Sequence, residues 1–496
     1  MRSAGILLPI TSLPTRYGIG GFSEEAYAFA DRLAEAGQTI WQILPVVPTG
    51  FGDSPYQSFS TFAGNPYMIS LDELCQTGLL SKEECEDADA CEDPEYVDYG
   101  RVYRTRYAVL RKAFGRFSAD RAEGYGRFLK ENGDWLPNYA LFMAIKESLG
   151  GIPWSSWPEP LMMREESALA KARTELAGEI AFQYFLQYEF DVQWKKLKQY
   201  VNGKGIRIFG DMPIYVAMDS ADAWADPKLF QFNDGLVPEN VAGCPPDGFT
   251  ADGQLWGNPL YDWDYQRTTG YVWWIRRMRR VSSLYDIVRI DHFRGFESYY
   301  SIPYTEKTAR NGIWRKGPGL DVFRAIREAC GDIRVVAEDL GYLTDDVRQM
   351  VRDSGYPGMK VLQFAFGSDP QNEYLPHHYG RNCVVYTGTQ DNDTSRGYFS
   401  SAPERERRFC LNYLGRPDCT EEEFAWTLIR TAFASVSDTV IIPMQDYLNL
   451  GTEARMNIPS TRGGRNWRWR MLPGAFDGKL AGQIREMTEL YSRLAD

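Results

Sequence analysis

Eight short runs of apolar and β-branched residues, each bounded by turn residues, recur along this chain of 496 residues. Stretches with a helical character separate them. Strands buried on both faces of a parallel sheet read as such continuous runs, not as an alternation of apolar and polar residues. The runs are Gly5–Ile10, Thr39–Val46, Ile206–Asp211, Tyr285–Asp291, Ile333–Glu338, Met359–Phe366, Cys383–Gly388 and Thr439–Met444.

Eight strands that alternate with helices predict an α/β fold, a (β/α)8 TIM barrel. A doubly wound open sheet is the alternative, but it gives no reason for the number eight. Because a plain barrel needs about 250 residues, about half of this chain is insertion. We expect residues 1–496 to form a single catalytic barrel with large, partly helical insertions between its strands. One would be a mostly helical subdomain over about 50–205, and the other an active-site loop subdomain over about 212–284.

The two insertions differ in character. The first contains an acidic stretch and then helical segments near 102–118, 137–149 and 165–202. The second is rich in Gly, Pro, Trp and Asp and lacks helical periodicity, and long loops of this kind in a compact domain are usually functional. At its end, the short basic run Arg276–Arg280 is interpreted as a solvated helix face.

Composition excludes several classes of function. The net charge of −12 would repel nucleic acid and anionic membranes. No two of the eight cysteines have CxxC spacing, which excludes zinc ribbons and thioredoxin motifs. So few cysteines in so long a chain do not predict a disulfide scaffold, which favours a reducing, cytoplasmic location. No run of 18 apolar residues is present, so we expect no membrane partner. The chain has only three histidines, which excludes HExxH zinc sites, and nothing in it predicts a cofactor.

Carboxylates stand at or just after the ends of four predicted strands: Asp211, Asp291, Glu338 and Asp391. In a barrel of this type the active site lies where strands end and loops begin. Converging carboxylates favour cleavage of a glycosidic bond, which requires an acid and a carboxylate on either side of the bond. Two alternatives stay open. In the first, the acids would bind a divalent metal, although a calcium-binding loop requires glycine where this chain has Arg396. In the second, the acids would only cap helices and pair with arginines.

Spacing within one strand refines this hypothesis. Residues i and i+2 of a strand face the same side, so Arg289 and Asp291 point together into the barrel mouth. A guanidinium keeps a neighbouring carboxylate ionised, as a nucleophile must be. Glu338 follows Val335–Ala337, and burial there would raise its pKa, as suits a general acid. The alternative is that Arg289 simply neutralises a buried acid.

Nine motifs in order along nearly the whole chain give it a family resemblance. They are Trp41–Pro45, Gly52–Tyr56, Gly210–Pro213, Pro245–Asp247, Gly253–Pro259, Arg289–Gly295, Ala337–Gly341, Asp391–Thr394 and Arg455–Pro459. With these the chain resembles the 4-alpha-glucanotransferases, also called amylomaltases or disproportionating enzymes (glycoside hydrolase family 77). The resemblance implies transfer of α-1,4-glucan segments from a donor maltooligosaccharide to the 4-hydroxyl of an acceptor glucan or glucose.

The resemblance also implies roles for individual residues. Asp291 would be the nucleophile of a retaining double displacement, Glu338 the acid/base and Asp391 the transition-state stabiliser. Retention predicts that the two reacting carboxyl groups lie ~5–5.5 Å apart. The implied substrate-binding residues are Ser54, Tyr56, Asp211, Gln254, Trp256, Arg289, His292, Asp339, Gln390 and Asn457. The rings of Tyr56, Trp256, Phe249 and Trp224 are candidates to stack on sugars, although for Phe249 and Trp224 core packing is the favoured alternative. The segment 455–469 resembles a mobile lid.

This chain departs from the family pattern at two places. The family usually has histidine immediately before the stabilising aspartate, where this chain has Gln390. Glutamine still hydrogen-bonds a hydroxyl but cannot carry a charge. The lid is one residue longer than usual. Two alternative functions are therefore kept, an α-glucan hydrolase and a glucan-binding protein without turnover.

Overall fold

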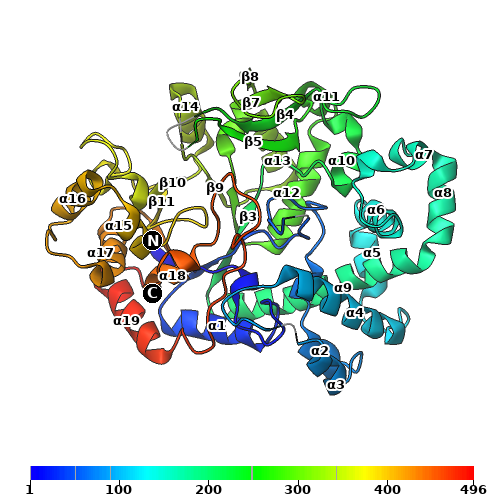
Figure 1. The fold of residues 1–496 in the computed structure, drawn as a ribbon, viewed down its shortest axis with the longest axis horizontal. Helices are drawn as coiled ribbons and strands as arrows, with labels where there is room; N and C mark the ends of the chain where they lie inside the picture. Colours follow the sequence, from blue (N-terminus) through cyan, green and yellow to red (C-terminus); the bar gives the residue numbers. More distant parts are fainter. Residues whose placement is uncertain (1, 51, 90, 247–249, 342, 496) are drawn as a thin grey trace.

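All eight predicted runs form strands of one parallel sheet (Figure 1). The computed structural model describes residues 2–50, 52–89, 91–246, 250–341 and 343–495. The strands are β1 (Ser3–Leu7), β2 (Ile40–Gln42), β3 (Arg207–Met212), β6 (Ile287–Ile290), β9 (Val335–Ala337), β10 (Gly358–Val361), β11 (Cys383–Tyr386) and β12 (Thr439–Pro443). Nearly all their side chains are buried, as continuous apolar runs require. The predicted (β/α)8 barrel is confirmed.

The barrel closes in two different ways. The first strand pairs with the last, with Ser3 opposite Thr439 and Leu7 opposite Pro443. Strands β9 and β10 share no ladder, but the backbone N–H of Ala337 donates to the carbonyl of Pro357 at 2.9 Å. Near the chain end, Arg493 donates to the carbonyls of Ser3, Phe433 and Ser435, so both termini lie side by side (Figure 1).

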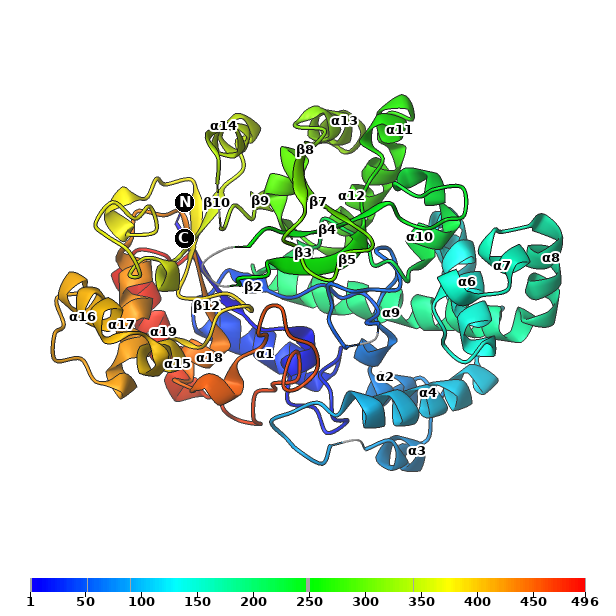
Figure 2. The ribbon, with the colours of Figure 1, turned by 45° about the horizontal axis from the view of Figure 1, so that its top comes forward.

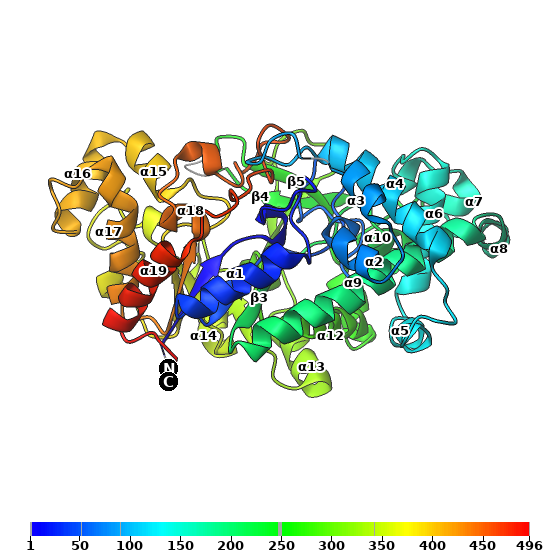
Figure 3. The same ribbon diagram turned by 90° about the horizontal axis from the view of Figure 1, so that it is seen from below.

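Helices cover the outside of most strands (Figure 3). After successive strands come α1 (Glu24–Glu35), α9 (Ala177–Gly203), α12 (Val272–Leu284), α13 (Asp321–Cys330), α14 (Asp345–Ser354), α17 (Glu421–Ala434) and α19 (Gly478–Leu490). The segment between β10 and β11, described throughout, forms only the 3-10 turns η6 (Leu362–Phe364) and η7 (Pro376–His378). One position of the outer ring therefore lacks an α-helix. Helices α15 (Ser395–Ser401), α16 (Glu404–Tyr413) and α18 (Met444–Tyr447) flank the later strands.

The long gap between β2 and β3 is helical, as its periodicity predicts (Figure 1). Before α9 it contains α2 (Leu71–Gln76), α3 (Lys82–Asp87), α4 (Tyr99–Arg116), α5 (Tyr125–Glu131), α6 (Leu136–Ser148), α7 (Glu159–Met162) and α8 (Glu166–Glu175). Whether this segment is a subdomain that folds by itself stays a prediction.

A second, antiparallel sheet lies beside the barrel and was not predicted (Figure 2). Its order is β5 (Gln254–Pro259), β4 (Asn240–Cys244), β7 (Ser298–Pro303) and β8 (Ile313–Lys316). Strands β4 and β5 come from the predicted loop insertion, which also contains α10 (Ala221–Ala225), α11 (Trp263–Thr268) and all of α12, so the expected lack of helical periodicity there was wrong. Strands β7 and β8 come from the next gap along the chain. The sheet therefore joins two separate insertions over one side of the barrel mouth.

The basic run on α12 is not simply a solvated face, so that interpretation was wrong. Arg277 is 1% exposed and donates to the carbonyls of Pro213 and Ile214, just after β3. Arg276 pairs with Asp134 at 2.8 Å. A buried guanidinium is tolerated here because backbone carbonyl oxygens accept hydrogen bonds from it.

Candidate active site

Arg289 lies at the centre of the cluster of acids predicted at the strand ends. Its Nη1 donates to both carboxylate oxygens of Asp211, at 2.9 and 2.7 Å, and its Nη2 lies 2.7 Å from Asp291 Oδ1. The register of β3 and β6 sets Asp211 directly opposite Arg289, and the i, i+2 spacing puts Asp291 on the same side. The guanidinium thus compensates two carboxylates from neighbouring strands.

Glu338 is fixed against the segment that carries Asp291. Its Oε2 accepts a hydrogen bond from the backbone N–H of His292 at 2.7 Å, and its Oε1 accepts one from Leu340 at 2.8 Å. Burial raises the pKa of Glu338 from 4.5 to about 7, the charge of Arg289 lowers it, and the charge of Asp291 raises it. The expectation that desolvation raises the pKa of this carboxyl is met.

Asp391 is held by amide donors on either side. Asn457 Nδ2 donates to its Oδ1 at 2.6 Å, and Gln390 Nε2 lies 3.2 Å from its Oδ2. Arg455 donates to the carbonyl of Asp391 at 2.8 Å. Burial raises the pKa of Asp391, and the bond from Asn457 lowers it. Segment 455–457, the start of the predicted lid, therefore contacts the carboxylate that β11 positions.

Tyr56 connects these acids. Its hydroxyl donates to Asp211 Oδ2 at 2.6 Å and accepts from Gln390 Nε2 at 2.9 Å. Burial raises the pKa of Tyr56 well above 10, so it keeps its proton. Ser54 Oγ accepts from the backbone N–H of Tyr56 at 3.2 Å and shapes the loop. Burial also raises the pKa of Asp211, while Arg289 and Tyr56 lower it.

His292 and Trp256 form an apolar wall beside the acids. Trp256 meets His292 edge-on, with ring centroids 4.9 Å apart, and its Nε1 donates to Gln254 Oε1 at 2.9 Å. His292 has a left-handed backbone, φ 52°, a conformation that clusters at functional sites. Burial lowers the pKa of His292 to about 3, so the ring is neutral. Its Nε2 is buried and has no hydrogen-bond partner among the described residues.

Comparison with known proteins decides the family. A sequence model of the family described as 4-alpha-glucanotransferase matches residues 8–474. The chain belongs to this family. It is 48% identical to the 4-alpha-glucanotransferase of Clostridium butyricum, over 98% of this chain and 99% of that protein. It is 46% identical to that of Thermus thermophilus, over 99% of each.

One solved structure agrees with the family assignment, and a second shows the shared fold. The amylomaltase from Streptococcus agalactiae in complex with acarbose superposes with a TM-score of 0.96, at 41% identity and with full coverage of both chains. The amylomaltase from Corynebacterium glutamicum, 20% identical, gives a TM-score of 0.79 over 99% of this chain and 74% of that chain, which shows a shared fold.

Asp339 contacts the neighbouring strand of the barrel wall. Its Oδ1 accepts from the backbone N–H of Met359 on β10 at 2.7 Å. A Cβ at Gly358 would lie 2.4 Å from Asp339 Oδ2, so any other residue there would displace this carboxylate. This contact bridges β9 and β10 where the ladder is missing. A contact of Asp339 with sugar stays a prediction.

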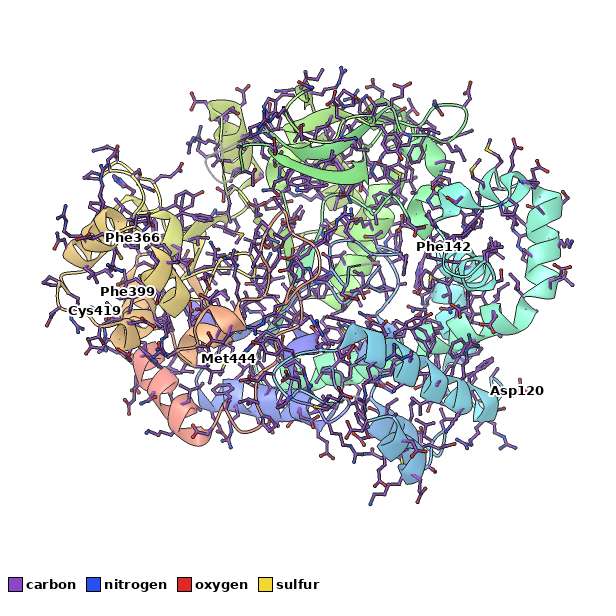
Figure 4. The ribbon with its side chains drawn as sticks, viewed as in Figure 1. Asp120, Phe142, Phe366, Phe399, Cys419 and Met444 are labelled. Atoms are coloured by element: carbon purple, nitrogen blue, oxygen red, sulfur yellow. The ribbon has the colours of Figure 1, made fainter. Side chains whose placement is uncertain are left out.

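The aromatic predictions have mixed outcomes. Trp224 is 0% exposed and packs against Phe142 and Trp157, so it belongs to the core, as was the favoured interpretation, and it offers no face to sugar. Figure 4 places Phe142 on α6, within the helical insertion. Trp224 is buried because the short helix α10 turns its ring inward, where the ring N–H donates to the carbonyl of Leu161. Phe249 and Asp247 lie outside the described residues.

Two site residues were not singled out from the sequence. Trp467 packs on Tyr56, with ring centroids 5.5 Å apart, and the side chain of Arg455 donates to the backbone carbonyl of Asp391. Both belong to the predicted lid, which was identified only as a segment.

The described residues contain no group of three or more His, Cys, Asp or Glu placed to hold a metal ion. Asp393 accepts hydrogen bonds from Thr394 and Thr452.

Proposed function

We propose that Asp291, Glu338 and Asp391 carry out the glucan transfer of this family by a retaining double displacement. The activity itself follows from the family: α-1,4-glucan segments move from a donor to the 4-hydroxyl of glucose or a maltooligosaccharide. The observation that supports the mechanism best is the pairing of Asp291 with Arg289, next to a partly buried Glu338 whose pKa desolvation raises to about 7.

In the first step Glu338 gives its proton to the glycosidic oxygen as the bond from that oxygen to the anomeric carbon breaks. An Asp291 oxygen forms a new bond to the anomeric carbon. In the second step the acceptor 4-hydroxyl loses its proton to Glu338. Its oxygen then bonds to the anomeric carbon as the bond to Asp291 breaks. Both carboxyl groups return to their starting states.

Asp391 would accept hydrogen bonds from sugar hydroxyls, and these bonds strengthen as positive charge grows on the ring. Ser54, Tyr56, Asp211, Gln254, Trp256, Arg289, His292, Asp339 and Asn457 are proposed as the surrounding substrate site, and Gln390, which bonds Tyr56 and Asp391, as a residue that acts on it. The unpartnered Nε2 of His292 supports this proposal, because a buried polar atom needs a partner and a sugar hydroxyl supplies one.

Transfer instead of hydrolysis requires that an acceptor sugar displaces Asp291 faster than water does. Positioned binding gives an acceptor a very high effective molarity. The rings of Trp256 and Tyr56 support this, because apolar rings bind the faces of sugars and displace water. A lid at 455–469 that covers the intermediate would act in the same direction.

We also propose a cytoplasmic location, on the basis of the cysteines. The described residues contain no disulfide, as is typical of a reducing compartment. Among the described residues, no helix is both long and apolar enough to cross a membrane.

The product pattern from maltotriose tests the activity. Transfer gives glucose together with a ladder of longer chains, whereas hydrolysis gives only shorter products and a binding protein gives none. For the covalent step, Glu338→Gln is incubated with maltotriosyl fluoride, whose leaving group needs no proton. The protein mass should increase by one maltotriosyl group, located at Asp291. The same treatment of Glu338→Gln/Asp291→Asn should leave the mass unchanged.

A further inference from the structure

A single amide nitrogen joins two parts of the site. Gln390 is 4% exposed, and its Nε2 donates both to Tyr56 Oη at 2.9 Å and to Asp391 Oδ2 at 3.2 Å. The tyrosine hydroxyl uses its own proton on Asp211, so at Gln390 it can only accept. The carboxylate of Asp391 also only accepts. The position therefore requires two N–H donors, which the primary amide supplies.

These bonds are part of a continuous path between the proposed stabiliser and the proposed nucleophile. From Asp391 it passes through Gln390, Tyr56 and Asp211 to Arg289, whose other nitrogen lies 2.7 Å from Asp291 Oδ1. Asn457 and Arg455 hold Asp391 from the lid side. Hence the side chain of Gln390 links the carboxylate of Asp391 to Tyr56.

We propose that Gln390 is a positioning residue, which fixes Asp391 relative to Asp291 through Tyr56 and does so without a titratable group. The inference rests on the proposed function, because it assigns Asp391 a role in the transition state. It differs from the expected role of Gln390 as a substrate-binding residue. A positioning role acts on the orientation of Asp391, so its loss affects the transition state more than the bound ground state.

The first test removes the donors and keeps the shape. Gln390→Met has a similar length and no N–H, and we expect kcat to fall about 10- to 100-fold with KM changed less than about 3-fold, as expected for one charge-assisted hydrogen bond. The matched control is Gln266→Met in α11, which removes the bond from buried Gln266 to the carbonyl of Leu229, remote from the acids. It should lower stability and leave kcat unchanged.

The second test restores the donors through a group that titrates. In Gln390→His the protonated ring has two N–H groups for the two acceptors, and the neutral ring has one. The charged groups that face this position are Asp211, Arg289, Asp291, Asp391 and Arg455, and none of them is changed. We expect kcat near that of the unmodified protein at low pH, falling towards that of Gln390→Met as pH rises through the pKa of the ring.

The outcomes separate this inference from the proposed function. If the unmodified protein forms no product ladder from maltotriose, the proposed function is wrong. If it forms the ladder but Gln390→Met raises KM and spares kcat, Gln390 binds substrate directly and the inference is overturned. A pH profile of Gln390→His that runs parallel to that of the unmodified protein would overturn it as well. A fall in kcat for Gln390→Met, together with an additional pH-dependent limb for Gln390→His, supports the inference.

Discussion

The burial of Glu338 leads to a quantitative prediction for the pH dependence of the enzyme. Its pKa rises from 4.5 to about 7. A carboxyl group with the ordinary value would be protonated in only about one molecule in 300 at pH 7. About half of the Glu338 side chains are protonated there, a gain of roughly 150-fold, which corresponds to roughly 3 kcal/mol. Because Glu338 must deliver a proton, this rise supplies the active form near neutrality.

The assay is the initial rate of glucose release from maltotriose, measured as kcat/KM from about pH 5 to about pH 9, which reports the ionisation of the free enzyme. We expect a basic limb centred near pH 7, so that kcat/KM at pH 8 is about tenfold below its plateau. The sign follows from the acid role, because only the protonated form reacts and it disappears as pH rises.

Glu338→Gln is the control for this limb. The variant should lose about 10²- to 10⁴-fold in activity on maltotriose. With maltotriosyl fluoride, its rate of forming the glycosyl-enzyme should not vary over the same pH range. A basic limb that persists in this variant would show that another group delivers the proton. A limb near pH 4.5 in the unmodified protein would refute the argument from burial.

Four further predictions follow from individual contacts. Asn457→Ala removes the 2.6 Å bond to Asp391, and kcat should fall about 10- to 100-fold with the melting temperature nearly unchanged. Arg289→Met leaves Asp211 buried without a compensating charge, so urea unfolding should show a loss of about 3–5 kcal/mol; a loss below about 1 kcal/mol would contradict the burial of this pair. Trp224→Ala should cost about 3–5 kcal/mol in the same assay with kcat of the folded enzyme retained, whereas a rise in KM would restore Trp224 to the sugar site. Prolonged dialysis against a chelator should leave the rate unchanged, and a rate recovered only with added metal would favour the metal-dependent alternative.

The barrel was predictable because its signal is local. Each strand is a short apolar run, and the run Cys383–Gly388 differs from β11 (Cys383–Tyr386) only at its end. The run Met359–Phe366 extends too far for a different reason. Its apolar residues continue past β10 into the 3-10 turn η6, where burial persists although the strand has ended.

The antiparallel sheet was missed because its evidence is not local. Strand β4 pairs with β7 from a different gap, with Asn240 opposite Pro303. Strand β8 is exposed along its whole length and carries no apolar run. Arg277 shows the same limit, since its burial depends on carbonyls 63 and 64 residues away. A basic run alone does not reveal such acceptors.

The convergence of the acids followed from topology, but their bonding did not. In a barrel the ends of parallel strands meet at one mouth, so Asp211, Asp291, Glu338 and Asp391 were expected together. The link between Gln390 and Tyr56 joins residues 334 positions apart. Sequence shows that both are polar and near the site, and only the folded chain shows which donor reaches which acceptor.

The pairing of the first strand with the last has a consequence for how this chain is made. Ser3–Leu7 leaves the ribosome when Thr439–Pro443 has not yet been translated, and one edge of β1 then has no permanent neighbour. An unpaired apolar edge is a template for wrong association. Arg493, which holds the carbonyl of Ser3, is translated later still. The nascent polypeptide therefore depends on protection from aggregation until β12 and Arg493 have been translated.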